Sequence, residues 1–301
     1  MQQSPLPECN KKRPAARRGF ALVSTMTAII VLSLIGGSLL HLRSGLSYSQ
    51  KDGEQRVKLE MVVRAAVNVA FLGLTDTRAE KRWRVDGVPT TVVFNDIPIT
   101  LTVQDESGKI DLNASPRDTF VRLFQSAGSD ADTAAALADR ILDWRESNNL
   151  AHLNGSTDED YRASGSKVRP RHGPFQSVDE LKMVLGITPE LFDKIRPALT
   201  VYSQSQQISR QTAPREVLLT LPGMSEAAVA EIINDRLQGT EDPEDRSLFV
   251  RPGVLNPLLP LGGRSFTITA TGKSGSNQIV HEEVIRITDD PKRPFLVLMR
   301  K

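Results

Sequence analysis

Histidine and serine are the side chains of this sequence that could support metal-assisted or nucleophilic catalysis. The four histidines, at positions 41, 152, 172 and 281, are scattered, and no two have a metal-binding spacing such as His-Glu-x-x-His. Two glutamates follow His281, but neighbouring side chains of a strand point to opposite faces. No serine lies in a Gly-x-Ser-x-Gly motif, and no phosphate-binding loop is present. The sequence therefore predicts no catalytic site and no enzyme activity.

The element that most constrains where the chain works is an uncharged stretch, Phe20–Leu42, directly after a basic leader. As a helix it would be roughly 35 Å long, enough to cross a hydrocarbon core of about 30 Å. The basic residues before it favour a cytoplasmic N-terminus. They are Lys11, Lys12, Arg13, Arg17 and Arg18. The sequence thus predicts one membrane-spanning helix and an exported remainder after Arg43.

The junction between leader and helix distinguishes two kinds of anchor. A secretory signal peptide has an apolar core of about 7–15 residues and a small-residue cleavage site after it, which is not the pattern here. Gly19 followed by Phe20 instead resembles the junction of type IV prepilins, where a prepilin peptidase removes the leader and methylates the new N-terminus. An uncleaved single-pass anchor is the alternative interpretation.

Charge and cysteine content limit the function classes of the exported part. The chain has 301 residues and a formal charge of +2, of which the leader through Gly19 contributes +4 and the remainder −2. The exported part is therefore not basic overall and gives no general electrostatic reason to bind nucleic acid. The one cysteine, Cys9, lies in the leader, so a cleaved product would contain no disulfide.

Apolar periodicity predicts an α+β fold in which a sheet is interrupted by an all-helical insert. Helical spacing continues toward Leu74, and Asn95-Asp96 marks a hairpin between two strand patterns. Short capped helices follow, with a polar stretch over 145–174, before strand patterns return at Ser265. The predicted parts are a leader at 1–19, a transmembrane and extended helix at 20–75, sheet at 76–110, helical insert at 111–261 and sheet at 262–301.

Two segments of the insert, 181–195 and 217–233, share a helix-hairpin-helix pattern in which a glycine precedes a Thr or Ser helix cap. Such units often bind nucleic-acid backbones. The binding versions have a second glycine two positions after the first, whereas this chain has Thr188 and Ser225 there, followed closely by Glu190 and Glu226. We therefore favour structural packing. A membrane-anchored DNA-binding protein of an uptake system is the alternative hypothesis.

Several sequence segments occur along nearly the whole chain in the order typical of one family. In this the chain resembles general secretion pathway protein K, a minor pseudopilin family of type II secretion. These segments are Arg17–Leu42, Asp105–Asn113, Ile141–Trp144, Gly173–Leu181 and Thr212–Val217. The resemblance implies a pilin-like fold, with a long N-terminal transmembrane helix packed on an antiparallel sheet and a large inserted helical domain. It also implies a single-pass protein of the cell inner membrane whose C-terminal domain lies in the periplasm.

The same resemblance implies a role at the tip of the pseudopilus, where the protein would assist export of folded proteins across the outer membrane. Its implied partners are other minor pseudopilins of the tip complex and the prepilin peptidase, with no nucleic acid. Most pilin-like subunits have glutamate at the fifth mature position, thought to pair with the neighbouring subunit's N-terminus. This chain has Ser24 there, which suits a subunit with no neighbour above it, because an unpaired carboxylate in lipid is costly. A type IV pilus minor pilin is a third, weaker hypothesis.

Calcium binding by the helical domain is a further implication of the family resemblance. Calcium takes six to eight oxygen ligands from flexible loops. The oxygen-bearing residues in and just before the polar stretch that could supply them are Asp143, Glu146, Asn148, Asp158, Glu159 and Asp160. A solvated acidic loop is the alternative interpretation.

Overall fold

The structure is a computed structural model that describes residues 18–76, 83–148, 150–238, 264–275, 277–288, 290 and 292–301. Within the first helix, side chains are described for 22–38 and from 53 onward. The leader up to Arg17, with Cys9, lies outside the described residues, as does the end of the predicted insert, 239–261.

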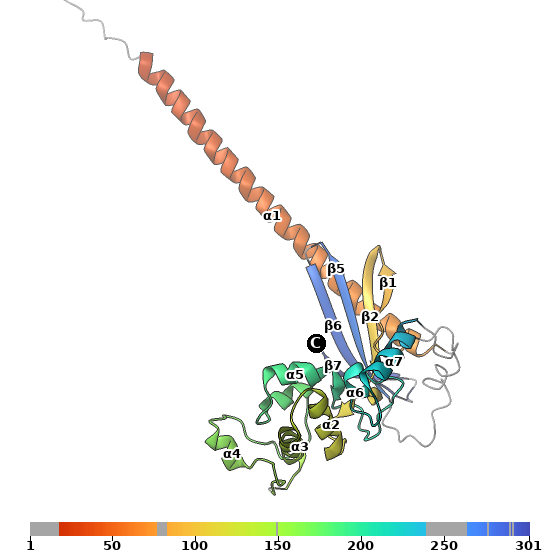
Figure 1. Cartoon of the computed structure of the whole chain (residues 1–301). Helices are drawn as coiled ribbons and strands as arrows, with labels where there is room; N and C mark the ends of the chain where they lie inside the picture. The colour runs from red at the N-terminus through yellow and green to blue at the C-terminus, as the bar shows by residue number, and fades with distance from the viewer. Residues whose placement is uncertain are drawn as a thin grey trace, which may run out of the picture. The chain divides into compact units, whose positions relative to one another are not determined.

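Helix α1 spans Arg18–Leu74 and begins close to the predicted leader junction (Figure 1). The chain divides into two compact units between Val57 and Lys58, so α1 contributes to both. The first unit contains the N-terminal part of α1. The second unit contains the C-terminal part of α1 with the sheets and the other helices.

The main sheet of the second unit is antiparallel, with strand order β1-β2-β5-β6-β7. Its strands are β1 (Thr90–Phe94), β2 (Ile97–Asp105), β5 (Ser265–Ser274), β6 (Asn277–Ile287) and β7 (Phe295–Arg300). The predicted hairpin is confirmed: Asn95 and Asp96 join β1 to β2 with φ of 46° and 64°, the left-handed turn that matches strand twist. Strand β5 continues past Gly272 to Ser274.

One face of this sheet packs against α1 from Lys58 onward, because both present apolar side chains at the right period. Helix residues spaced three and four apart are buried: Leu59, Val62, Val63, Ala66, Val67, Ala70 and Leu74. They contact alternate residues of the two central strands, including Ile99, Leu101, Ile268 and Ala270. Gly272 allows the close approach, since a Cβ there would lie 2.7 Å from Ile99 Cδ1 and Val63 Cγ2.

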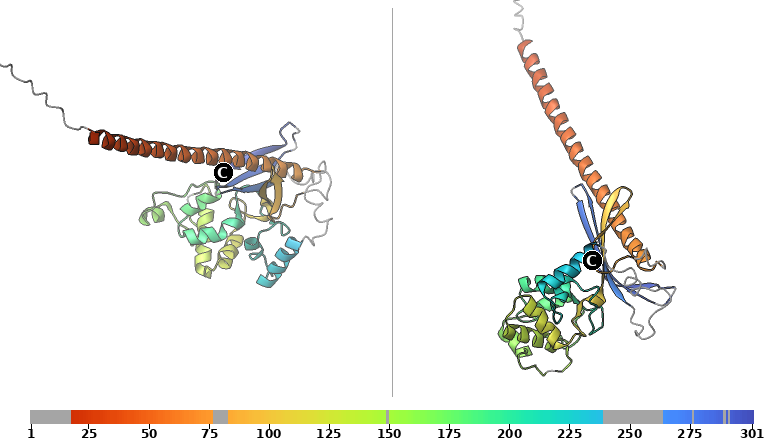
Figure 2. Two further views of the ribbon diagram at one scale, coloured as in Figure 1. Left: turned by 90° about the horizontal axis from the view of Figure 1, so that it is seen from above. Right: turned by 45° about the vertical axis from the view of Figure 1, so that its right-hand side comes forward.

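Between β2 and β5 the chain forms the helical region, which we define as residues 106–238 (Figures 1 and 2). Its helices are η2 (Glu106–Gly108), α2 (Arg117–Ser126), α3 (Ala131–Arg145), α4 (Asp158–Ala163), η3 (Val178–Met183), α5 (Pro189–Ile195), η4 (Arg196–Ala198), α6 (Arg215–Leu218) and α7 (Glu226–Gln238). Its apolar core is separate from the core between α1 and the sheet.

The prediction that the insert is all-helical is wrong in one respect. Strand β3 (Ile110–Asp111) pairs in parallel with β4 (Leu199–Thr200), so a small second sheet lies within the helical region. Strands of two residues show no alternation that could be recognised in the sequence. The buried Asp111 carboxylate reinforces this pairing, because it accepts hydrogen bonds from the hydroxyl of Ser203 (3.0 Å) and the amide of Gln204 (2.8 Å).

Candidate functional sites

The leader junction lies in the first turns of α1, which include Gly19 and Phe20; their side chains are outside the described set. From Leu22 to Ser38 the helix exposes large apolar side chains on all sides, among them Val23, Ile30 and Leu34. Three hydroxyl groups in this stretch, on Thr25, Thr27 and Ser38, donate to carbonyls of the preceding helical turn. Among the described residues, no helix combines the length and the apolarity needed to cross a membrane.

Ser24, at the predicted fifth mature position, has an exposed side chain on α1. Its neighbours along the described part of the helix include Val23 and Thr27, and no carboxylate lies between Leu22 and Ser38. The helix therefore carries no acidic group there that would require a partner in an apolar environment.

Asp143, the first predicted calcium ligand, is buried on α3 with 5% of its surface exposed. Both carboxylate oxygens already accept hydrogen bonds from the following loop. Oδ1 lies 2.9 Å from the amide of His152 and 2.6 Å from its Nδ1, and Oδ2 lies 2.9 Å from the amide of Ser156. The loop therefore closes directly over Asp143.

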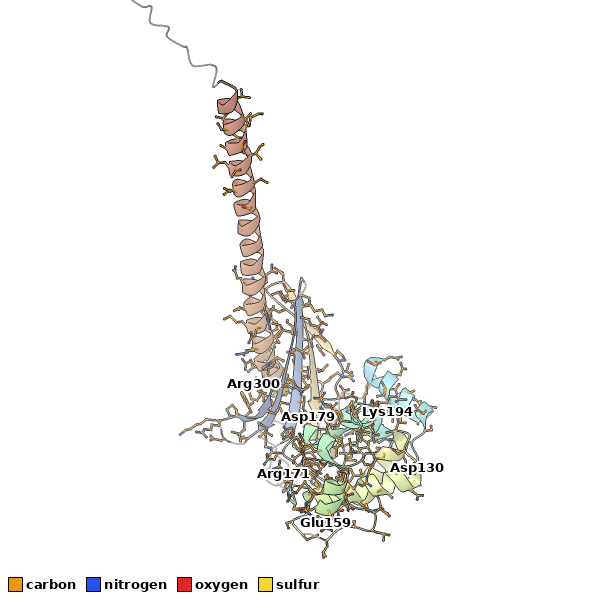
Figure 3. The ribbon with its side chains drawn as sticks, turned by 90° about the vertical axis from the view of Figure 1, so that its left-hand side faces the viewer. Asp130, Glu159, Arg171, Asp179, Lys194 and Arg300 are labelled. Atoms are coloured by element: carbon orange, nitrogen blue, oxygen red, sulfur yellow. The ribbon has the colours of Figure 1, made fainter. Side chains whose placement is uncertain are left out.

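The other predicted ligands have different partners. Asn148 donates to Glu146 (3.1 Å), and Asp158 contacts Nε2 of His172 (3.2 Å). Asp160 accepts from both the amide and the hydroxyl of Thr157 in the capping box of α4, while Glu159 is exposed on that helix (Figure 3).

The structure therefore does not bring the six predicted ligands together. Within the described ranges, no group of three or more His, Cys, Asp or Glu residues is arranged to hold a metal ion. Calcium needs converging oxygens with available lone pairs. Asp143 instead faces converging N–H donors, so the residues in this arrangement do not fit the ion.

An aromatic cluster holds the polar stretch 145–174 in place. The Trp144 ring, 1% exposed, stacks on Phe175 with ring centroids 5.9 Å apart and lies 6.1 Å from Tyr161. Asn113 exchanges two hydrogen bonds with the backbone of Phe175. Buried Glu180 accepts from the Trp144 indole (3.2 Å) and from the guanidinium of Arg171 (Figure 3). Side chains from both ends of the stretch thus join one core.

Comparison with known proteins covers this part of the chain. A family model described as type II secretion system (T2SS), protein K, matches residues 99–204, from β2 through β4. Type II secretion system protein K of Klebsiella pneumoniae is 25% identical over 207 residues, which make up 60% of this chain and 61% of that protein. Over these residues the chain is similar to the type II secretion system protein K family.

A solved protein K structure supports the fold. The crystal structure of the GspK-GspI-GspJ complex from the enterotoxigenic Escherichia coli type 2 secretion system contains a chain similar to this one, with a TM-score of 0.57. The identity is 16%, and the match covers 85% of this chain and 98% of that chain. The α+β architecture, with a helix packed on an antiparallel sheet plus a helical region, is therefore similar to that of the solved chain.

The two hairpin turns have the predicted local geometry, and an acidic residue lies at the start of each following helix. Gly186 and Gly223 have φ of +87° and +77°, and Thr188 and Ser225 cap the next helices. The first helices are short, a 3-10 helix and a single α turn. Glu190 lies in the first turn of α5, and Glu226 in the first turn of α7 pairs with Arg215. The guanidinium of Arg140 lies beside the first turn but donates to the carbonyl of Leu185, and the acids at the helix starts disfavour a phosphate there.

Sequence reasoning missed a group of buried acids where the sheet meets the helical region. Glu106 accepts from the Thr267 hydroxyl (2.6 Å) and pairs with Lys109 (2.7 Å). Nearby, Gln104 donates to the carbonyl of Thr212 (2.6 Å). The segment Asp105–Asn113 is one of those that resemble protein K, but only the structure shows that it lies where the sheet meets the helical region. We call this place the joint. The sequence feature that could have indicated this joint is the acidic pair Asp105-Glu106 directly after the apolar alternation of β2.

Asp105 at this joint provides a pH-dependent prediction. The carboxylate is 1% exposed, and burial raises its pKa above the usual value, although hydrogen bonds from Ser107 oppose the shift. The folded state therefore prefers the protonated form. Stability from this preference is present below the unfolded pKa of about 3.9 and is lost as pH rises through the folded pKa.

Asp105→Asn keeps an acceptor for the Ser107 amide but carries no charge. We expect it to raise the thermal midpoint at pH 7 and to leave it nearly unchanged at pH 3, where the wild-type carboxyl is neutral. Circular dichroism melts at the two pH values measure both effects. A midpoint that falls at pH 7 would show that the ionised carboxylate is needed.

Proposed function

We propose that the chain is the minor pseudopilin at the tip of a type II secretion pseudopilus, where it assists export of folded proteins across the outer membrane without acting as an enzyme. The observation that carries the proposal is the family match over residues 99–204, because this segment contains both the joint and the Trp144 core of the helical region. The match to the Klebsiella protein spans about three fifths of that relative's length.

The proposed partners are the minor pseudopilins that correspond to GspI and GspJ. The Escherichia coli GspK was solved in complex with those two proteins. The fold similarity extends over 98% of that chain, which supports the proposal that this chain has corresponding partners.

We further propose that α1 is inserted in the inner membrane through Phe20–Leu42, with the second compact unit in the periplasm. The exposed apolar side chains between Leu22 and Ser38 support this, since they would be costly in water. The internally bonded hydroxyls of Thr25 and Thr27 also support it, because polar groups in lipid must find partners within the segment.

The leader is proposed to be removed by a prepilin peptidase between Gly19 and Phe20, and the new N-terminus methylated. A subunit at the tip has no neighbour above it, which agrees with Ser24 in place of the usual glutamate. The N-terminal amine of this subunit remains available to the subunit below only if the leader has been removed.

Complementation of a deletion strain tests the proposal. The wild-type chain should restore secretion of type II substrates and should begin at methylated Phe20 by mass spectrometry. Gly19→Val places a branched side chain at the scissile bond, so we expect retention of the leader and at least a tenfold loss of secretion. Ala15→Val, also in the leader but away from the junction, should behave as wild type.

Two results would oppose this function. Full secretion in the deletion strain would remove the tip role, whatever the state of the N-terminus. An intact leader on the functional wild-type chain would favour the uncleaved anchor.

A further inference from the structure

Two carboxylates on one face of α3 need compensation, because both are buried. Asp139 and Asp143 lie four residues apart, so they are neighbours on the helix surface, and they are 2% and 5% exposed. Buried carboxylates persist only when positive charge or hydrogen-bond donors surround them. A bound cation is one solution, and protein donors are the other.

Asp139 is compensated by a guanidinium from α2. Arg117 Nε lies 2.5 Å from Oδ1 and its terminal nitrogen lies 3.1 Å from Oδ2, which forms a bidentate pair. Burial opposes ionisation of Asp139, but the bond and charge of Arg117 outweigh it, so the pKa lies below its usual value. The amide and side chain of Asn154 approach Oδ2 at 3.4 Å from the loop side.

Asp143 is compensated by the loop itself. Its oxygens accept three hydrogen bonds, two from His152 and one from Ser156. The loop backbone approaches so closely that a Cβ on Gly155 would lie 1.7 Å from Oδ2. Calcium lies 2.3–2.6 Å from its ligand oxygens and needs further oxygens around it. Neither the space nor the acceptors are present beside this oxygen in the described residues.

The direction of the backbone amide dipoles around Asp143 also disfavours a bound cation. The amides of His152 and Ser156 point their hydrogens at the carboxylate, so their positive ends occupy the directions from which a cation would approach. We propose that Arg117 and the His152–Ser156 backbone take the place of a metal ion here, so that the loop between α3 and α4 closes over α3 independently of calcium. We call this arrangement the donor clamp, formed by Arg117, Asp139, Asp143, His152, Asn154, Gly155 and Ser156.

Hydrogen exchange of the full-length chain in detergent, followed by mass spectrometry of peptides covering 150–157, tests the donor clamp. In the wild type, exchange rates should be the same in EDTA and in millimolar calcium chloride. His152→Ala removes the Nδ1 contact, and Arg117→Met removes the guanidinium while keeping a similar length. Each should accelerate exchange of these peptides about tenfold or more in both buffers, as expected for loss of a charge-assisted hydrogen bond.

Leu153→Ala is the matched control. Leu153 lies in the same loop but is 97% exposed, so its substitution should leave exchange unchanged. The thermal midpoint gives a second readout, because an ion bound at a hundred times its Kd would raise it by roughly 5–10 °C. We expect no such rise.

The proposal fails if EDTA accelerates exchange of the wild-type loop or if calcium raises the midpoint by that amount. It also fails if His152→Ala and Arg117→Met both leave exchange unchanged. Should either variant not fold, the comparison of buffers on the wild-type chain still decides the question.

Discussion

Trp144→Ala is expected to destabilise the helical region by about 3–5 kcal/mol, the usual cost of deleting a large buried aromatic side chain. For the compact unit Lys58–Lys301 this corresponds to a fall of roughly 6–20 °C in thermal midpoint. The indole is 1% exposed, stacks on Phe175 and donates to Glu180, so alanine leaves a cavity and removes a donor from a buried carboxylate. Thermal unfolding followed by circular dichroism measures the change.

Trp144→Phe separates the two contributions. The smaller ring can still stack on Phe175, while the hydrogen bond to Glu180 is lost. Glu180 keeps its bonds from Arg171 and the amide of Gln176, so we expect a cost of only about 1–2 kcal/mol beyond the loss of ring volume. Equal midpoints for the alanine and phenylalanine variants would show that the stacked ring does not hold the polar stretch in place.

Elements with a repeating pattern could be predicted from the sequence. Strand β2 alternates buried and more exposed residues along its whole length, β5 does so over Phe266–Gly272, and α1 buries residues at helical spacing. The hairpin had a specific turn sequence, Asn95-Asp96, whose left-handed conformation those residue types tolerate. In each case the residue types within the element were sufficient to predict it.

The order of the polar stretch could not be predicted, because it depends on contacts between distant residues. Asn113 and Phe175 are bonded across 62 positions, and Ile110 pairs with Leu199 in a two-residue strand. Composition alone indicates a solvated loop when Asn, Gly, Ser and Asp are frequent. Here those residues serve as turn formers and donors around Asp139 and Asp143.

The six proposed calcium ligands show what a count of oxygen atoms in the sequence leaves open. A sequence shows which residues carry carboxylates, but not whether their lone pairs are already occupied. Asp160 caps α4, and Asp143 accepts three hydrogen bonds. The spacing of Asp139 and Asp143 on one helix face was visible, but the donor side depends on Arg117, 22 positions before Asp139. A useful sequence indicator would be an Arg, His and Gly set flanking paired acids.

Gly108→Ala is expected to open the joint between the sheet and the helical region. A Cβ at this buried position would lie 2.5 Å from the carbonyl oxygen of Thr212 and 2.8 Å from the amide nitrogen of Ala213. Both are backbone atoms, so a rotamer change cannot relieve the overlap and one segment has to move. Overpacking of this kind costs about 1–3 kcal/mol and more where the backbone cannot shift.

Movement at Gly108 would also disturb neighbouring bonds of the joint. Gln104 donates to the same Thr212 carbonyl, and the amide of Ser209 donates to the carbonyl of Ser107. We therefore expect a fall in midpoint of roughly 2–12 °C and faster hydrogen exchange around residues 209–213. Gly173→Ala is the matched control, since a Cβ there meets other atoms only at 3.8 Å or beyond. Equal exchange rates in the two variants would mean that the helical region is held on the sheet by contacts other than this close backbone approach.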